Sequence, residues 1–85
     1  MYRRLKTVMV REVAEDLLLL DLERQKIHQL NQVASFIWRN CDEAGAPEEI
    51  AARLAIEFEV EEHTAHKDVI ETLGKLRSLN LIVDV

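Results

Sequence analysis

At Asn31 the sequence changes from a strand pattern to a helical pattern. Before this residue, Leu17–Leu22 is almost continuously apolar and Lys26–Leu30 (KIHQL) is strand-like. After it, apolar side chains recur at the spacing of an amphipathic helix, at Val33, Phe36, Ile37 and Cys41. Since an asparagine side chain can accept hydrogen bonds from the free N–H groups of a first helical turn, the chain is predicted to fold as strands followed by helices.

Three strands are predicted before this change. Thr7–Ala14 is rich in β-branched residues, Glu15-Asp16 breaks the pattern, and Leu17–Leu22 is expected to be a central strand covered on both faces. Glu23-Arg24-Gln25 then turns the chain into Lys26–Leu30. Because this turn lacks the Gly or Asn of tight hairpins, it should be longer than two residues. The last strand of this meander has a sequence neighbour on one side only, so its other edge is expected to be open.

Three helices are predicted after Asn31. The first ends at the break Ala44-Gly45-Ala46. Pro47 suits the first position of a second helix, which carries apolar side chains at i, i+4 and i+8: Ile50, Leu54 and Phe58. The third helix is predicted from about Glu62–Thr64 to Leu79, and a short extended segment, Leu81–Val83, follows it.

The third helix has an apolar surface that covers roughly half its circumference, which is wider than a surface helix needs. One edge of this surface is expected to face the core: Val69, Ile70 and Leu73. The other edge, flanked by Asp68 and Lys75, consists of Ala65, Thr72, Leu76 and Leu79. The sequence leaves open whether this second edge faces outward or is buried against the first two helices.

The composition predicts one small globular domain over residues 1–85. Hydrophobic residues make up 48% of the chain and charged residues 32%, which is too apolar for a disordered chain. The formal net charge is −5, whereas nucleic-acid binders concentrate Lys and Arg against phosphates, so no nucleic-acid partner is expected. No apolar run approaches the roughly 20 residues that span a bilayer, and no signal segment is visible. A cytoplasmic protein without a membrane partner is expected.

Candidate catalytic and metal-binding residues are few. His63 and His66 lie three residues apart, but a zinc site needs three or four ligands, so a solvated helix start is the favoured interpretation. A nucleophile–base pair of Cys41 and His28 is one interpretation, but the place of Cys41 on the apolar helix face with Val33 and Ile37 favours a small buried core thiol. Trp38 is expected to anchor the core. With two glycines in the chain and no Gly-rich phosphate loop, we predict no enzyme, no metal and no cofactor.

The strand Lys26–Leu30 is the strongest functional candidate. An uncovered edge strand invites aggregation unless the protein blunts it or uses it. Here Lys26, His28 and Gln29 add polarity, and no proline intervenes. Either these side chains keep the edge soluble, or an extended peptide adds to it as a further strand through main-chain hydrogen bonds.

Three segments together resemble the PqqD-like proteins, the recognition elements of ribosomal peptide biosynthesis. They are LLLLD followed by KIHQLNQVASFIW, then APEEIAARLAIEFEV, and DVIETLGKLRSLNLI. The resemblance covers about Val8 to Ile82. Its most telling elements are Leu30-Asn31, the helix that carries Ala34-Ser35-x-Ile37-Trp38, the helix opening Pro47-Glu48-Glu49-Ile50, and Asp68-Val69.

The resemblance implies an α+β, winged-helix-like fold, with a three-stranded antiparallel sheet followed by three helices. Members of the family bind the leader segment of a precursor peptide as an added strand between the third strand and the third helix, and present it to a processing enzyme. The peptide-binding residues implied for this chain are Lys26, Ile27, His28, Gln29, Leu30, Ala65, Asp68, Val69, Thr72, Leu73 and Leu76.

The resemblance is closest to the stand-alone recognition subunit of split lasso-peptide leader peptidases, which work with a separate cysteine protease. A PqqD-type chaperone for a radical SAM enzyme in quinone-cofactor biosynthesis is the alternative. Relatives usually carry Gly where this chain has Arg24-Gln25, and often an aromatic residue where it has His28.

A DNA-binding winged-helix regulator and a dimerisation module that uses the open edge are the competing functions. The expected state is a monomer or weak dimer.

Overall fold

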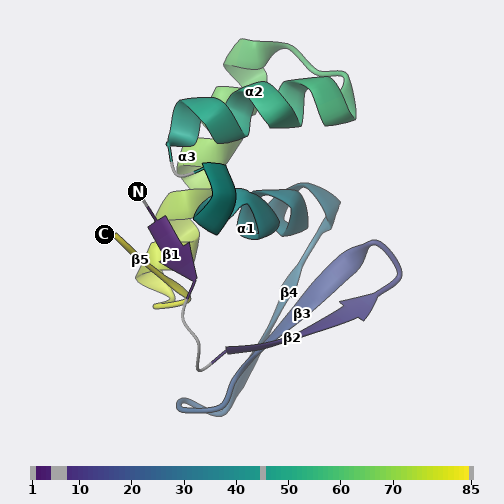
Figure 1. The fold of residues 1–85 in the computed structure, drawn as a ribbon. Coiled ribbons are helices and arrows are strands. Elements are labelled where there is room, and N and C mark those ends of the chain that lie inside the picture. The colour runs from purple at the N-terminus through teal and green to yellow at the C-terminus, as the bar shows by residue number, and fades with distance from the viewer. Residues whose placement is uncertain (1, 5–7, 45, 85) are drawn as a thin grey trace.

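The computed structural model describes residues 2–4, 8–44 and 46–84, in which a three-stranded sheet precedes three helices (Figure 1). The bounds of the elements are β1 Tyr2–Arg4, β2 Val8–Val13, β3 Asp16–Asp21, β4 Lys26–Leu30, α1 Gln32–Ala44, α2 Pro47–Phe58, α3 Glu62–Ser78 and β5 Ile82–Asp84. The predicted α+β class and the order of strands and helices are confirmed. Thr7 and Gly45, which belong to a predicted strand and a predicted break, lie outside the described residues.

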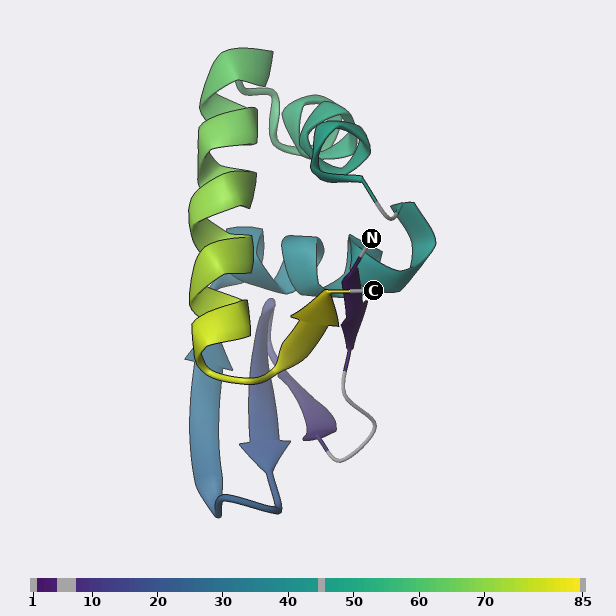
Figure 2. The ribbon, with the colours of Figure 1, turned by 90° about the vertical axis from the view of Figure 1, so that its left-hand side faces the viewer.

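The larger sheet is an antiparallel meander in the order β2-β3-β4. Along β3 the side chains alternate: Leu17 and Leu19 are buried, whereas Leu18 and Leu20 are half-buried. The helices lie on one side of this sheet (Figure 2), and α1 contacts both β3 and β4. The expectation that the central strand is covered on both faces is therefore wrong, because a single layer of helices covers only the face of Leu17 and Leu19.

The β3–β4 turn is four residues long, as the absence of a tight-turn signal predicts. Its last residue, Gln25, has a φ of 56°, the left-handed region that Gly adopts most easily. Asp21 is 2% exposed and closes the turn: its Oδ1 accepts the backbone N–H of Arg24 at 3.1 Å, and its Oδ2 lies 3.4 Å from Nη1 of the Arg24 guanidinium. This carboxylate stabilises a turn that has no glycine.

The helices begin where the sequence predicts. The side chain of Asn31 caps α1, since its Oδ1 accepts the N–H of Ala34 at 2.9 Å, and Pro47 occupies the first turn of α2. The core beneath the sheet includes Trp38 from α1 and Leu54 from α2, each 1% exposed. Trp38 therefore lies in the core, as expected.

The faces of α3 differ in part from the prediction. Val69 and Leu73 are buried as expected, but Ile70 is 48% exposed, so its assignment to the core is wrong. Ala65 and Leu76 have 0% and 1% exposure, so they do not form an outward apolar edge. Both belong to the hydrophobic core, and α3 packs against α1 and α2, so the alternative of burial holds for them.

A second, two-stranded sheet was not predicted. In it, β1 pairs antiparallel with β5, with Arg3 opposite Val83. Leu81, which precedes β5, and Ile82, its first residue, are 0% and 1% exposed. This pairing joins the two ends of the described chain against α1 and α3.

Among the described helices, none combines the length and hydropathy that crossing a bilayer requires.

Candidate functional site

The strand β4 has one free edge within the part of the chain that the structure describes. Its other edge pairs with β3, so that His28 lies opposite Leu19 and Leu30 opposite Leu17. Because both of those leucines face the helices, His28 and Leu30 face the helices as well. Ile27 points to the opposite face and is 67% exposed. Half of the backbone N–H and C=O groups of β4 are therefore directed away from the sheet and lack a neighbouring strand.

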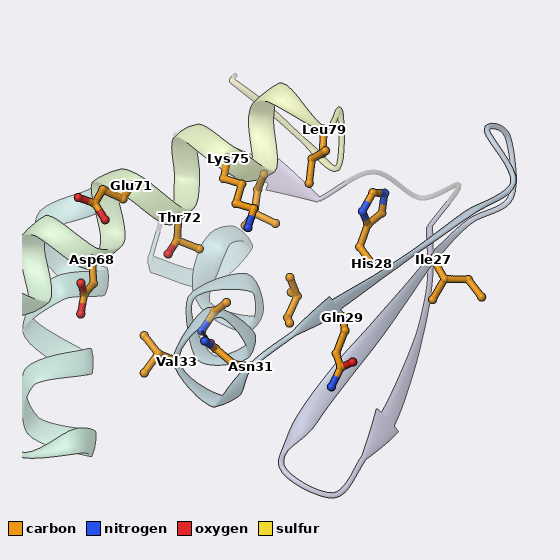
Figure 3. Close-up of a pocket in the computed structure, with 13 residues that line it drawn as sticks. Ile27, His28, Gln29, Asn31, Val33, Asp68, Glu71, Thr72, Lys75 and Leu79 are labelled. Atoms are coloured by element: carbon orange, nitrogen blue, oxygen red, sulfur yellow. Dashed lines mark hydrogen bonds between the residues drawn. The ribbon is translucent and has the colours of Figure 1, made fainter.

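A groove of about 560 Å³ lies beside this edge, between β4, the start of α1 and α3 (Figure 3). It is lined by Ile27, His28, Gln29, Leu30, Asn31, Val33, Ala34, Asp68, Glu71, Thr72, Lys75, Leu76 and Leu79. Figure 3 shows the side chain of His28 directed from β4 toward α3, and that of Ile27 directed away from the groove. Ile27 thus contributes its backbone to the groove.

Hydrogen bonds at the junction of β4 and α1 set the corner of this groove. The buried hydroxyl of Ser35 donates to the carbonyl of Leu30 at 3.0 Å, and the N–H of Ser35 donates to the carbonyl of Asn31 at 2.8 Å. Together with the Asn31 cap, these bonds fix the direction in which the chain leaves the strand. The free edge of β4 consequently ends at Leu30.

The other wall of the groove is one face of α3. Two rows of side chains spaced four residues apart form this face, and they consist of Asp68, Thr72 and Leu76, and of Glu71, Lys75 and Leu79. Residues four apart lie one above another on a helix, so each row runs along the groove. Asp68, Thr72 and Leu79 are half-buried, and Glu71 and Lys75 are exposed. The wall therefore combines carboxylate, hydroxyl, ammonium and apolar groups.

The structure brings together seven of the eleven residues that the sequence assigns to a site. Those that line the groove are Ile27, His28, Gln29, Leu30, Asp68, Thr72 and Leu76. Lys26 is exposed at the start of β4 outside the groove. The remaining three, Ala65, Val69 and Leu73, are buried in the core behind the groove wall.

Six lining residues lie outside the predicted set: Asn31, Val33, Ala34, Glu71, Lys75 and Leu79. For Glu71, Lys75 and Leu79 the sequence contains a usable signal, since they continue the four-residue spacing beside Asp68-Thr72-Leu76. For Asn31, Val33 and Ala34 it contains none, because their place in the groove depends on the angle between β4 and α1.

The other candidate sites of the sequence do not assemble in the described residues. Cys41 is 0% exposed and its Sγ lies 3.2 Å from the carbonyl oxygen of Ile37, as expected of a core thiol. No group of three or more potential metal ligands occurs among the residues that the structure places. His63 is exposed and His66 half-buried near the start of α3.

Comparisons with known proteins give one family and two solved structures. The family described as coenzyme PQQ synthesis protein D (PqqD) matches residues 16–82. The chain is similar to a structure of TbiB1 in complex with the TbiA(beta) leader peptide, with 25% identity, a TM-score of 0.86, and coverage of 98% of this chain and 96% of that one. It is also similar in fold to lasso peptide synthetase B1 complexed with the leader peptide, with 24% identity, a TM-score of 0.85, and coverage of 98% of both chains. No curated protein matches the sequence.

Proposed function

This chain belongs to the PqqD family, and we propose that it binds the leader segment of a ribosomally synthesised precursor peptide and presents it to a processing enzyme. The observation that carries this proposal is the free edge of β4 beside the groove, in a fold that superposes over almost its whole length on two leader-peptide complexes. The proposal treats residues 1–85 as a single recognition domain.

The leader adds to β4 as a fourth strand of the sheet. Main-chain hydrogen bonds to the free edge supply affinity without regard to sequence, and side chains that enter the groove supply specificity. A strand alongside the five residues of β4 extends about 17 Å. The contacts fall on the backbone of Ile27–Leu30 and on the side chains of His28, Asp68 and Thr72, with Leu76 as part of the floor.

The buried members of the predicted set have a supporting role in this proposal. Ala65, Val69 and Leu73 hold α3 against the core, and thus fix the distance between the groove wall and β4. Lys26 lies where the peptide leaves the edge. These four residues shape the site without lining it.

The partner enzyme supplies the chemistry. The similarity to lasso peptide synthetase B1 favours the lasso-peptide branch, for which the family resemblance implies a separate cysteine peptidase that cleaves the leader. The family description favours a second candidate, a chaperone for a radical SAM enzyme of quinone-cofactor biosynthesis. A short open reading frame for a precursor peptide, encoded beside this chain together with a protease gene, would support the first branch. The same reading frame beside the gene of a radical SAM enzyme would support the second. A linked or adjacent binder raises the effective concentration of its cargo at the enzyme, commonly to millimolar levels.

Hydrogen exchange followed by NMR tests the added strand. Binding of the precursor encoded next to this chain should protect alternate amides within Ile27–Leu30, because the remaining amides of β4 already bond to β3. The amides of α2 serve as the internal control and should exchange at unchanged rates. Protection confined to α2, or absent from β4 at saturating precursor, contradicts the proposal. Light scattering on the same samples distinguishes peptide binding from dimerisation through the free edge.

A further inference from the structure

The charges on the groove wall have a fixed order along α3. Asp68 and Glu71 come first, and Lys75 follows one turn later. In Figure 3 the two carboxylates lie toward one end of the groove and Lys75 toward the other. The side chains of these three residues make no hydrogen bond or ion pair with the rest of the described chain. Their charges are therefore available to a ligand.

The strand β4 continues this asymmetry across the groove. It runs opposite to α3, so that Asn31, which follows its end, lies toward Asp68, and His28, nearer its start, lies toward Leu79 (Figure 3). His28 is directed toward the end of the groove that holds Lys75 and Leu79. One end of the groove thus presents carboxylates, and the other presents an ammonium group and an imidazole.

We propose that this groove selects peptides in which a basic side chain precedes an acidic one by two or four residues. The inference rests on the proposed function and specifies its substrate class. A peptide that adds to β4 in the antiparallel sense, as β3 does, starts beside Leu30 and ends beside Lys26. Its earlier residues therefore meet Asp68 and Glu71, and its later residues meet Lys75.

The spacing follows from the geometry of helix and strand. Glu71 and Lys75 are separated by about 6 Å along α3, and Asp68 and Lys75 by about 10 Å, at 1.5 Å per residue. Two strand residues span about 7 Å and four span about 13 Å, so the long side chains of Lys, Arg and Glu bridge either distance. Spacings of one or three residues place the two charges on opposite faces of the added strand. Only even spacings direct both charges into the groove.

The expected size of the effect is moderate. Glu71 and Lys75 are exposed, and exposed ion pairs of this kind change affinity by about two- to fivefold each. High salt should reduce the preference, because the screening length falls to about 3 Å at 1 M. Main-chain and apolar contacts are insensitive to the order of charges in the peptide. The effect of charge order is therefore measurable as a difference in affinity between two peptides of identical composition.

Selection from a random twelve-residue peptide library displayed on phage, with the full chain as bait, tests the inference. Enriched peptides should carry base-before-acid pairs at spacings of two and four more often than at one and three. The double variant Glu71→Lys/Lys75→Glu keeps the net charge and reverses the order of the two exposed groups. It should favour acid-before-base pairs relative to the original chain. A synthetic base-before-acid peptide should bind the original chain about two- to tenfold more tightly than its charge-reversed counterpart, and the double variant should show the opposite order of affinities.

Three negative outcomes would contradict different parts of the inference. If the peptides shift the β4 amide signals in NMR spectra but show no preference for even spacings or for base-before-acid order, the charge order alone is overturned. Peptides that fail to reach β4, together with a precursor that fails to bind there, overturn the proposed function and the charge order with it. An unchanged preference in the folded double variant also overturns the charge order, since the variant replaces the ammonium group of Lys75 by a carboxylate and the carboxylate of Glu71 by an ammonium group.

Discussion

Asp21 shows at the scale of one residue how this chain closes its central hairpin without glycine. The carboxyl group is almost fully buried, and the backbone N–H of Arg24 holds its pKa below the ordinary value of 3.8. Burial raises the pKa, whereas the side chain of Arg24 adds to the lowering. Hydrogen bonds to the ionised form outweigh desolvation here, so the charged carboxylate is the form that stabilises the fold.

Asp21→Asn should therefore lower stability in a pH-dependent way. A carboxyl group whose pKa is depressed in the folded state stabilises fully above its unfolded pKa, and this contribution is lost as pH falls through the folded pKa. The variant should be less stable than the original chain at pH 7, and the difference should shrink as pH falls below about 4. Urea unfolding at several pH values measures it. Glu23→Gln, which removes a charge from the same turn, is the control and should show no such convergence; a difference that stays constant down to pH 2 contradicts the role of the ionised carboxylate.

The helix α3 both packs on the core and forms one wall of the groove, and a sequence pattern cannot separate these two roles. Its period predicts its bounds to within two residues, but the same apolar residues can face a core, a groove or solvent. Ile70 is exposed and Ala65 is buried because the crossing of α1 and α2 over α3 decides which part of the apolar surface is covered. The three-residue strands β1 and β5 escape prediction for another reason: they are too short to show a period, and their pairing joins opposite ends of the chain.

Matched alanine variants separate the core from the groove wall. Leu54→Ala removes a side chain with 1% exposure and should lower the unfolding free energy by roughly 2–5 kcal/mol. Thr72→Ala should leave stability nearly unchanged, since alanine is the better helix former. It should weaken precursor binding about two- to tenfold, the worth of one lost hydrogen bond. Thr64→Ala, an exposed position on the same helix outside the groove, is the control; equal affinities for the two threonine variants would remove Thr72 from the site.

At the scale of the whole molecule, the site lies between the two layers. The sheet supplies a free edge and the helical layer supplies the wall that faces it, while the buried hydroxyl of Ser35 links the two at Leu30. The sequence predicts the strand and part of the helix face, because each follows a local period. It does not predict Asn31, Val33 and Ala34 as lining residues, since the angle between layers is a property of packing. A peptide that bridges both layers binds only the folded chain.

This dependence on the folded state predicts a large thermal stabilisation by the precursor. A ligand that binds only the folded state stabilises it by about 2.7 kcal/mol at a concentration of 100 times Kd. In a domain of this size, each kcal/mol raises Tm by roughly 4–8 °C, so the expected shift is about 10–20 °C. Scanning calorimetry with the precursor, and with a scrambled precursor of equal composition, measures it.

The scrambled peptide should give a much smaller shift in Tm. Its main chain can still pair with β4, but its side chains no longer fit the groove. Ile56→Asp, at a position on α2 that is 80% exposed and outside the groove, should retain the full shift. Equal shifts with both peptides would mean that the groove does not read sequence, and no shift with either would mean that the folded chain is not the binding partner.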